Sequence, residues 1–280
     1  MTGTLYLCAT PIGNLEDMTF RVIRVLKEVD LIAAEDTRNS IKLLNHFDIH
    51  TPMTSYHEFN KIEKGKVLIG KLLEGTNIAL ITDAGMPGIS DPGEELVRMA
   101  YEAGIPVTVL PGACACVTAL TLSGLPTRRF SFEAFLPTDR KERKEALEAI
   151  RTEQRTIVMY EAPHRLLRTL GDLRETLGES REITVLRELT KKHESRFHGT
   201  IREAAEHYTN EEPKGECVLV IAGRPEEEIR AEQAEAWQEL SLEEHVAKYE
   251  ASGMDRKEAM KAVAKERGIS KRDVYQELLK

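Results

Sequence analysis

The sequence predicts an α/β protein with two α/β domains, a cleft between them and a small helical module at the C-terminal end. Three observations support this prediction. Short apolar or β-branched segments alternate with helical patterns up to Gly223, three of these segments end in loops rich in Pro and Gly, and the composition changes abruptly after Gly223. Alternation of this kind is typical of largely parallel sheets with short connections.

Eight segments have the composition of strands, and helical patterns separate them. The strand segments are Thr4–Ala9, Leu31–Ala34, Ile78–Thr82, Val107–Leu110, Phe130–Phe135, Thr156–Glu161, Ile183–Arg187 and Cys217–Ala222. The helical patterns are Phe20–Glu28, Arg38–His46, Glu94–Glu102, Cys114–Ser123, Lys141–Arg151, Arg165–Leu177 and Ile201–Tyr208. Because Pro111-Gly112 divides this region near its middle, we predict an N-terminal domain at residues 1–111 and a second α/β domain at residues 112–225.

An acidic segment follows the second α/β domain. Glu226–Glu239 holds six acidic residues against one basic residue, Arg230, and has no strand pattern. Such a charge run is typical of a solvated linker or an exposed helix. We therefore predict an acidic linker at residues 226–240.

Residues 241–280 are predicted to form three short helices separated by Gly turns. Leu242–Ala251 is periodic, and Asp255 and Ser270 have the sequence context of N-caps. The pattern resembles a helix-turn-helix module, and a small packing or dimerisation module is the alternative. Arg256–Lys280 holds eight basic and four acidic residues, a net charge of +4.

The composition excludes several classes of protein. With 41% hydrophobic residues the chain is not a disordered tail. No apolar run approaches the roughly 20 residues that span a bilayer, and the N-terminus lacks a signal-peptide pattern, so we expect a soluble cytoplasmic protein. The four cysteines form no CxxC pair, which argues against a disulfide framework or a structural zinc site. The net charge of −8 argues at first against nucleic acid, but the basic C-terminal end weakens that argument.

Four common site motifs are incomplete or absent. Residues 65–72 approach a P-loop, but Leu72 stands where a Ser or Thr would hold Mg²⁺, and the segment has a helical pattern. His193 and His198 are five residues apart, which on a helix turns them away from a shared metal. No strand leads into GxGxxG or GxSxG. We therefore predict no metal, nicotinamide or nucleophile-elbow site.

Three predicted strands end in loops that are rich in Pro and Gly. These loops are residues 10–15, 83–93 and 111–112. In open α/β sheets, ligands bind at the carboxyl ends of strands. We therefore expect the loops to converge on one crevice for a small molecule; ordinary surface turns are the alternative.

Acidic and basic residues stand together at further strand ends. They are Glu35, Asp36 and Arg38 after the second predicted strand, Glu161, His164 and Arg165 after the sixth, and Arg187, Glu188, Lys191 and Lys192 after the seventh. Any one group is compatible with a structural ion pair. Their repetition at one edge favours a functional cleft.

These motifs resemble, in order and spacing, the bacterial 16S ribosomal RNA 2′-O-ribose methyltransferases, a family built on the tetrapyrrole methylase (class III, S-adenosylmethionine-dependent) fold. The matching segments are TPIGNLED, AEDTR, TDAGMPGISDPG, the helix opened by Pro111-Gly112 with SGLP after it, YEAPHR and RELTKKHE. The resemblance runs from about Leu5 to Gly223, and the C-terminal helices resemble the family's own helix-turn-helix extension. Gly85-Met86-Pro87 stands where corrin and diphthamide methylases usually carry Gly-Asp-Pro.

The resemblance implies an S-adenosylmethionine cleft between two α/β domains of a homodimer. The residues expected to contact the cofactor are Pro11, Ile12, Met86, Ile89, Cys114, Ala115, Tyr160, Leu189 and Ala222. Cys114 stands where relatives commonly have Ser, with which it is nearly isosteric. The implied substrate is the 2′-hydroxyl of a cytidine in the decoding region of 16S rRNA in the small ribosomal subunit.

Methyl transfer from a sulfonium group depends on alignment, and a base near the ribose hydroxyl adds about 10²–10⁴-fold. The catalytic candidates are Asp36, Arg38, Asp83, Glu35, Glu161 and His164, together with Asp91. Arg38 and Arg165 are also candidates for holding RNA phosphates. We expect Asp36, Arg38 and Asp83 to matter most because they lie at strand ends that face the cleft, but the sequence does not rank the base.

RNA contacts are expected at Arg128-Arg129, Arg140–Lys144, Lys191-Lys192 and the C-terminal basic residues. Two alternatives stay open. A methylase of the same fold that acts on a small tetrapyrrole would not need the basic C-terminal module. A non-catalytic nucleic-acid-binding regulator would leave the loops at the strand ends unexplained.

Overall fold

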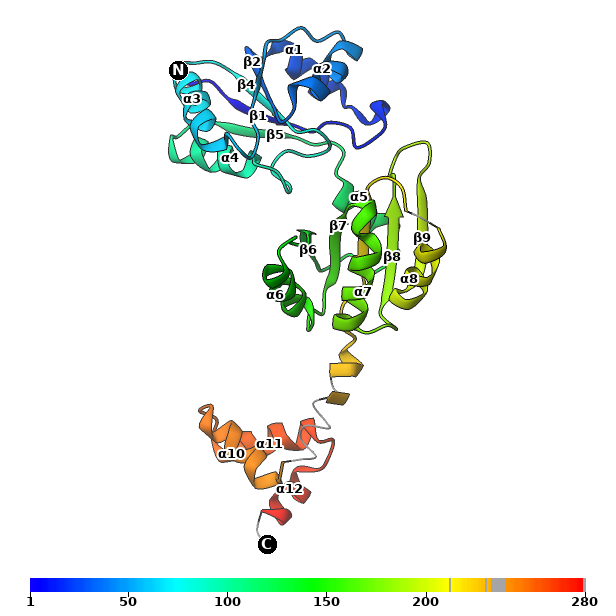
Figure 1. Cartoon of the computed structure of the whole chain (residues 1–280). Coiled ribbons are helices and arrows are strands. Elements are labelled where there is room, and N and C mark those ends of the chain that lie inside the picture. The colour runs from blue at the N-terminus through cyan, green and yellow to red at the C-terminus, as the bar shows by residue number, and fades with distance from the viewer. Residues whose placement is uncertain (212, 230, 233–239, 279–280) are drawn as a thin grey trace. The chain divides into compact units, whose positions relative to one another are not determined.

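The computed structural model describes residues 1–211, 213–229, 231–232 and 240–278. The chain divides into two compact units, Met1–Ala222 and Gly223–Lys280. The first unit holds two five-stranded sheets with their helices, and the described part of the second is helical (Figure 1). The two sheets lie on either side of residues 111–112 in the sequence, and we propose that they are the two predicted α/β domains. None of the described helices has the length and apolar character that crossing a membrane requires.

The first sheet is entirely parallel, as the sequence predicts. Its strands are β1 (Leu5–Cys8), β2 (Leu31–Ala34), β3 (Met53–Ser55), β4 (Ile78–Ile81) and β5 (Val107–Leu110), in the order β3-β2-β4-β1-β5. The carboxyl ends of all five strands therefore meet at one edge. β1 lies between β4 and β5, so the three strands that carry Pro- and Gly-rich loops are neighbours. The short β3 is not among the predicted strands because three residues show no periodicity.

Helices cover both faces of the first sheet (Figure 1). They are α1 (Phe20–Glu28), α2 (Thr37–His46), α3 (Lys61–Leu73) and α4 (Gly93–Glu102), with a short 3₁₀ turn, η1 (Leu15–Asp17), before α1. Leu5 and Leu7 of β1 pack in the cluster that includes α3 and α4, whereas Cys8 packs in the cluster that includes α1 and α2. Both faces are buried, so the strands are almost continuously apolar. Residues 65–72, the incomplete P-loop, lie inside α3.

The second sheet is mixed, and the prediction of largely parallel sheets is wrong here. Its strands are β6 (Phe130–Phe135), β7 (Thr156–Glu161), β8 (Glu182–Arg187), β9 (Ser195–Thr200) and β10 (Cys217–Ile221), in the order β6-β7-β10-β8-β9. β6 and β7 are parallel, and every other pair is antiparallel. Residues 188–194 between β8 and β9 are too few for a parallel crossover. His198 therefore lies on a strand rather than on the helix considered for the pair His193 and His198.

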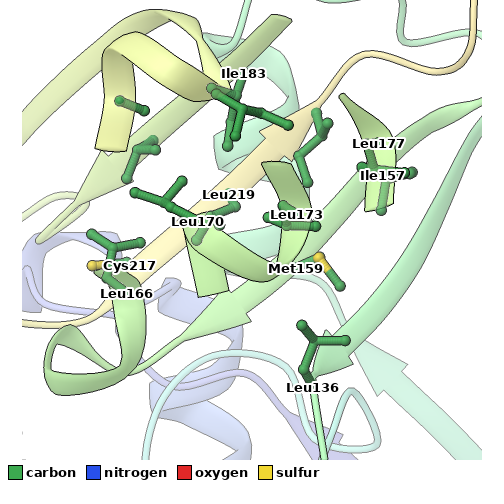
Figure 2. Packing of buried hydrophobic residues seen from close by; sticks show 14 of the residues in the cluster. Leu136, Ile157, Met159, Leu166, Leu170, Leu173, Leu177, Ile183, Cys217 and Leu219 are labelled. Atoms are coloured by element: carbon green, nitrogen blue, oxygen red, sulfur yellow. The ribbon is translucent and has the colours of Figure 1, made fainter. Parts of the chain in front are cut away.

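The largest apolar cluster of the second sheet lies under α7 (Leu166–Leu177). Its leucines recur at helical spacing and are buried: Leu166, Leu170, Leu173 and Leu177. They pack with strand residues such as Ile157, Met159, Ile183 and Leu219 (Figure 2). α6 (Arg140–Ile150) and α8 (Ile201–Asn210) join the same cluster, while α5 (Ala115–Leu122) packs with the opposite face. A short turn, η2 (Pro163–Arg165), precedes α7.

The second unit contains α10 (Leu242–Ala251), α11 (Arg256–Glu266) and α12 (Lys271–Glu277), at the predicted positions. The side chains of Asp255 and Ser270 accept hydrogen bonds from Glu258 N and Asp273 N, which confirms both predicted N-caps. Val246, Val263 and Val274 are buried in its core. Of the predicted acidic linker, residues 230 and 233–239 lie outside the described residues, and residues 226–229 and 231–232 are helical.

His245 gives the helical unit an expected dependence on pH. The side chain is buried; Arg267 Nε donates to its Nδ1 at 3.1 Å, and its Nε2 lies 3.3 Å from Glu266 Oε2. Burial lowers the pKa of His245, Arg267 and Lys248 add to this, and Glu266 opposes it. The unfolded chain therefore binds a proton more readily than the folded one below pH about 6.5. The unit should lose stability as pH falls through that range.

Amide hydrogen exchange of α10–α12 in the full chain between pH 8 and pH 5, corrected for intrinsic rates, measures this loss. His245→Gln keeps a polar side chain but does not titrate, so its unit should lose less protection between the two pH values. Protection in the native unit that stays constant over the range would contradict the prediction.

Candidate functional site

The first unit contains a cavity of about 280 Å³ at the carboxyl edge of the first sheet. The first sheet contributes the loops after β1, β2 and β4, and the beginning of α5 forms part of the lining. The second sheet contributes the carboxyl ends of β6, β7 and β8 and the beginning of the antiparallel β10. The predicted site residues that line it are Ile12, Glu35, Asp83, Met86, Ile89, Cys114, Ala115, Tyr160, Glu161 and Leu189, with Asp91. Residues from both halves of the sequence thus form one cavity.

Contacts between the loops confirm that the three Pro- and Gly-rich strand ends converge. Thr10 and Gly85 exchange two backbone hydrogen bonds of 2.9 and 3.1 Å, which join the loops after β1 and β4. Gly85 has φ +86°, a conformation that favours glycine. A Cβ on Gly112 would lie 2.6 Å from the Cβ of Ala9, so the loop after β5 also approaches β1 closely.

The loop after β4 is organised by Asp91. Its carboxylate accepts hydrogen bonds from the backbone N–H groups of Gly88 (2.9 Å), Gly93 (2.7 Å) and Ile89 (3.2 Å). Burial raises the pKa of Asp91, while these bonds oppose that rise. Its acceptor sites are largely used within the loop, so the carboxylate holds the turn that presents Ile89 and Met86 to the cavity.

Asp83 and Glu35 form a pair of carboxylates in the cavity wall. Glu35 accepts hydrogen bonds from the hydroxyl of Thr82 and, at 3.3 Å, from the backbone N–H of Asp83. Asp83 Oδ1 accepts from the backbone N–H of Asp36 at 3.2 Å. Asp83 is exposed as a residue, but partial desolvation of its carboxylate raises its pKa, and the negative charge of Glu35 raises it further. This carboxylate therefore holds a proton more readily than an ordinary aspartate does.

Asp36 and Arg38 do not line the cavity, although both were expected to face it. Asp36 caps α2, and the Arg38 guanidinium donates to both of its carboxylate oxygens, at 3.0 and 2.7 Å. The hydrogen bonds from Arg38 lower the pKa of Asp36 to about 2. The Arg38 side chain is 88% exposed. The pair is thus a capping arrangement beside the cavity residue Glu35, with an exposed guanidinium and a half-buried carboxylate that is a weak base.

Glu161 lines the cavity, but its carboxylate is hydrogen-bonded to residues that follow β7 in the second half of the unit. Its side chain is 1% exposed and accepts hydrogen bonds from the Thr169 hydroxyl and the Ala162 N–H, and Arg165 Nε lies 3.4 Å away. These contacts give it a structural role in anchoring the turn after β7. His164 is exposed in that turn and does not line the cavity.

Two predicted cofactor residues, Pro11 and Ala222, also lie outside the cavity lining. Pro11 directly precedes the lining residue Ile12. Ala222 follows β10, and its N–H donates to Glu182 O at the beginning of β8. Because β10 is antiparallel to β7 and β8, its first residue, Cys217, reaches the cavity and its last residue points to the opposite edge of the sheet.

The structure adds lining residues that the sequence did not single out for a cofactor. They are Thr82, Ala84, Gly85, Ser90, Phe135, Glu188, Lys191, Glu216, Cys217 and Val218. Lys191, which was expected to contact RNA, forms ion pairs with Glu188 at 2.9 Å and Glu216 at 3.4 Å. A Cβ on Gly13 would lie 2.3 Å from Lys191 Cγ. The Lys191 side chain therefore packs directly against the loop after β1. The loop motif after β4 could have identified four of these residues; the β10 residues carried no sequence signal.

The beginning of α5 faces the cavity through Cys114 and Ala115. Cys114 occupies the N-cap position without a side-chain capping bond, and the N–H of Cys116 donates to the Tyr160 hydroxyl at 3.0 Å. Burial raises the pKa of Tyr160, so the phenol is neutral. A helix beginning of this kind carries a partial positive charge and suits an anionic group such as a carboxylate.

Replacing Tyr160 by Phe is expected to lower the free energy of unfolding of the first unit by about 1–3 kcal/mol. The substitution keeps the ring but leaves the Cys116 N–H without its acceptor. Urea denaturation measures the loss. Tyr101→Phe, at an exposed ring on α4, is the matched control, and an equal change in both variants would contradict the role of this hydrogen bond.

No group of His, Cys, Asp and Glu side chains among the described residues is arranged to hold a metal ion. The site offers a cavity with both apolar and charged lining residues, a helix beginning and two neighbouring carboxylates, one with a raised pKa. Such a site can hold an extended organic ligand with a carboxylate at one end and can accept a proton from a second molecule.

Residues 4–205 match the family model of the tetrapyrrole (corrin/porphyrin) methylases. Among curated proteins, the chain is 54% identical to ribosomal RNA small subunit methyltransferase I of Halalkalibacterium halodurans, over 98% of this chain and 93% of that protein. It is 50% identical to the protein of the same name from Bacillus subtilis, over 98% and 93%. The protein of that name from Synechocystis is 49% identical, over 98% and 96%.

Solved structures share the fold at low sequence identity. Uroporphyrin-III C-methyltransferase of Thermus thermophilus in complex with S-adenosyl homocysteine superposes with a TM-score of 0.56 at 20% identity, over 79% of this chain and 97% of that one. A diphthine synthase superposes with a TM-score of 0.64 at 13% identity, over 79% and 90%. At these identities the likeness shows the fold.

Proposed function

Because the chain belongs to the tetrapyrrole methylase family, and because relatives about half identical to it over nearly its full length are ribosomal RNA small subunit methyltransferases, we propose that it methylates the ribose 2′-hydroxyl of a cytidine in 16S rRNA. The chain is an S-adenosylmethionine-dependent methyltransferase of small-subunit rRNA. The sequence identity of about one half to these methyltransferases, over nearly the whole chain, supports this conclusion. The position in the decoding region and the 2′-hydroxyl follow from the motif resemblance.

The cavity fits the cofactor. Apolar side chains such as Met86, Ile89 and Leu189 suit its adenine ring and methylene groups, and the beginning of α5 at Cys114 and Ala115 suits its carboxylate. When bound, S-adenosylmethionine supplies an activated sulfonium methyl group. The remaining task of the protein is to align the acceptor and to remove its proton.

Asp83 is the residue best suited to take the proton of the ribose hydroxyl. It lines the cavity, and its raised pKa makes it a stronger base than an ordinary aspartate. The hydrogen bond from the Asp36 N–H fixes its carboxylate. In this proposal the negative charge of Glu35 raises the pKa of Asp83, and the ion pair of Asp36 with Arg38 stabilises the turn before α2. Glu161 anchors the turn after β7.

The RNA surface includes fewer residues than the sequence suggested. Arg143 is buried, with its guanidinium bound to Asp172 at 2.7 Å and to the Thr169 hydroxyl, so it cannot contact RNA. Lys191 is engaged in the cavity wall. Of the segments predicted to contact RNA, the exposed basic residues that remain are Arg128, Arg129, Arg140, Lys141, Lys144 and Lys192 on the first unit and the basic residues of α11 and α12 on the second. We assign these to phosphate contacts.

The proposed partner is the small ribosomal subunit, and the proposed active form is a cytoplasmic homodimer. Incubation with tritiated cofactor and undermethylated small subunits, followed by nucleoside mass spectrometry, tests the function. The expected product is 2′-O-methylcytidine. Transfer to a corrinoid but not to RNA would favour the tetrapyrrole alternative. Failure of the chain to bind S-adenosylmethionine in calorimetric titration would favour the non-catalytic regulator.

A further inference from the structure

Backbone strain in the described residues gathers around the cavity. The non-glycine residues with φ in the left-handed region are Asp48, Ser90, Ala134, Glu188 and Thr190. Ser90 and Glu188 line the cavity, Thr190 lies between the lining residues Leu189 and Lys191, and Ala134 directly precedes the lining residue Phe135. Such conformations cost roughly 1–3 kcal/mol and persist where the surrounding structure imposes them. The strain at Ser90, Glu188 and Thr190 belongs to the loops of the cavity, whereas that at Ala134 interrupts a strand.

A β-bulge before Ala134 changes the face of the sheet to which the Phe135 side chain points. β6 pairs with β7 in parallel, but the register shifts between Phe132 and Ala134, so that Phe135 stands opposite Tyr160. In a regular strand, residues three apart point to opposite faces. The extra residue puts Phe132 and Phe135 on the same face, where both rings contact Tyr160, with centroid distances of 5.0 and 5.5 Å. A bulge that re-aims a side chain beside a site is a common structural device.

Phe135 is exposed although it contacts other aromatic rings. The residue is 49% exposed on the outermost strand of the sheet, and it lines the cavity. The Tyr160 ring beneath it is fixed by the hydrogen bond from Cys116 N–H. The strained backbone at Ala134 thus keeps an apolar ring exposed at the cavity. Packing within the protein does not explain this arrangement, because a buried ring would contribute more to stability.

We propose that Phe135 is a stacking platform for the nucleobase of the target nucleotide, which it holds so that the ribose hydroxyl faces Asp83. This inference rests on the proposed function. Proteins that read unpaired RNA bases stack them on aromatic side chains, and the contact is worth a large factor in affinity. Leu189 is buried and Tyr160 is half-buried, which suits them to the cofactor, while the exposed ring of Phe135 is open to a substrate that arrives from solvent.

The test compares Phe135→Leu, which keeps apolar bulk but cannot stack, with Phe135→Tyr, which can. For Phe135→Leu we expect kcat/KM for undermethylated small subunits to fall roughly tenfold or more, mainly through KM. Phe135→Tyr should retain most of the native value. The dissociation constant for S-adenosylmethionine, measured by calorimetry, should change less than twofold in both. Phe130→Leu, at a 39% exposed ring on the same strand outside the cavity, is the matched control.

A second pair of variants tests the bulge. Ala134→Gly accommodates φ +49° and should keep the native kcat/KM, whereas the β-branched Ala134→Val should reproduce the loss of Phe135→Leu. Loss of cofactor affinity in Phe135→Leu by the same factor would mean that the ring serves the adenine of the cofactor, and would overturn the proposal. An unchanged kcat/KM would overturn it as well. Either result would overturn only the role of Phe135, provided that the native protein methylates RNA. If the native protein did not methylate RNA, the proposed function itself would be wrong.

Discussion

Replacing Asp83 by Asn is expected to lower kcat for methyl transfer to small subunits by about 10²–10⁴-fold. The amide keeps an oxygen that can accept the hydrogen bond from the Asp36 N–H, so the loop should keep its conformation, but it cannot take the proton of the acceptor hydroxyl. Single-turnover transfer of tritiated methyl groups measures the loss. Calorimetric titration should show nearly native affinity for S-adenosylmethionine.

The pH dependence of the native enzyme provides a second measurement of the same residue. The pKa of Asp83 is raised by partial desolvation and by the charge of Glu35, so the carboxylate becomes protonated at a higher pH than an ordinary aspartate. The rate should therefore fall as pH decreases through that raised pKa, and this acidic limb should be missing in Asp83→Asn.

Asp36→Asn is the matched control for Asp83→Asn. Its carboxylate is a weak base with a pKa of about 2 and lies outside the cavity lining, so we expect a loss of less than roughly tenfold, through looser positioning of the turn. A nearly native rate in Asp83→Asn, or a larger loss in Asp36→Asn than in Asp83→Asn, would refute the assignment of the base.

Replacing Leu170 by Ala is expected to lower the free energy of unfolding of the first unit by about 2–5 kcal/mol. Leu170 is fully buried in the cluster under α7, and truncation removes apolar contacts and leaves a cavity among tightly packed neighbours (Figure 2). Urea denaturation with the m-value compared between variants measures the change. Leu170 does not line the cavity, so the folded variant should bind cofactor with native affinity.

Leu167→Ala is the control for Leu170→Ala. This side chain lies on the same helix and is 42% exposed, so its removal should cost less than about 1 kcal/mol. Equal losses in the two variants would mean that helix propensity, rather than burial in the cluster, accounts for the effect.

Much of the fold could be predicted because its signals are local. The central strands are continuously apolar, and α7 repeats leucine at helical spacing, so both patterns are visible in a single segment. The N-caps Asp255 and Ser270 likewise depend on residues three positions away. β3 and β9 were missed because Met53–Ser55 is very short and Ser195–Thr200 is largely polar.

The direction of β10 could not be predicted in the same way. The apolar pattern of Cys217–Ile221 is the same whichever way the strand runs, and direction depends on which neighbours it joins. The cofactor residues implied by the resemblance included Ala222, at the edge away from the cavity, and omitted Cys217 and Val218, which line it.

The ranking of the acids and bases also depended on contacts between segments. Asp36 and Asp83 are both aspartates after a strand, yet hydrogen bonds from Arg38 lower the pKa of Asp36, and partial desolvation of the carboxylate together with the charge of Glu35 raises the pKa of Asp83. Arg143 stands in a basic run but turns inward to Asp172. Burial and distant partners set these roles, and neither is encoded in a short window of sequence.

The sequence by itself determined the class of fold, the convergence of the strand-end loops and, through its motifs, the family and its chemistry. These depend on short-range patterns and on the shared edge of parallel strands. Only the tertiary structure decided which acid faces the cavity, which end of β10 reaches it and that Phe135 turns toward it. Those outcomes depend on strand pairing, burial and a register shift, because side-chain direction and pKa respond to neighbours that are remote in sequence.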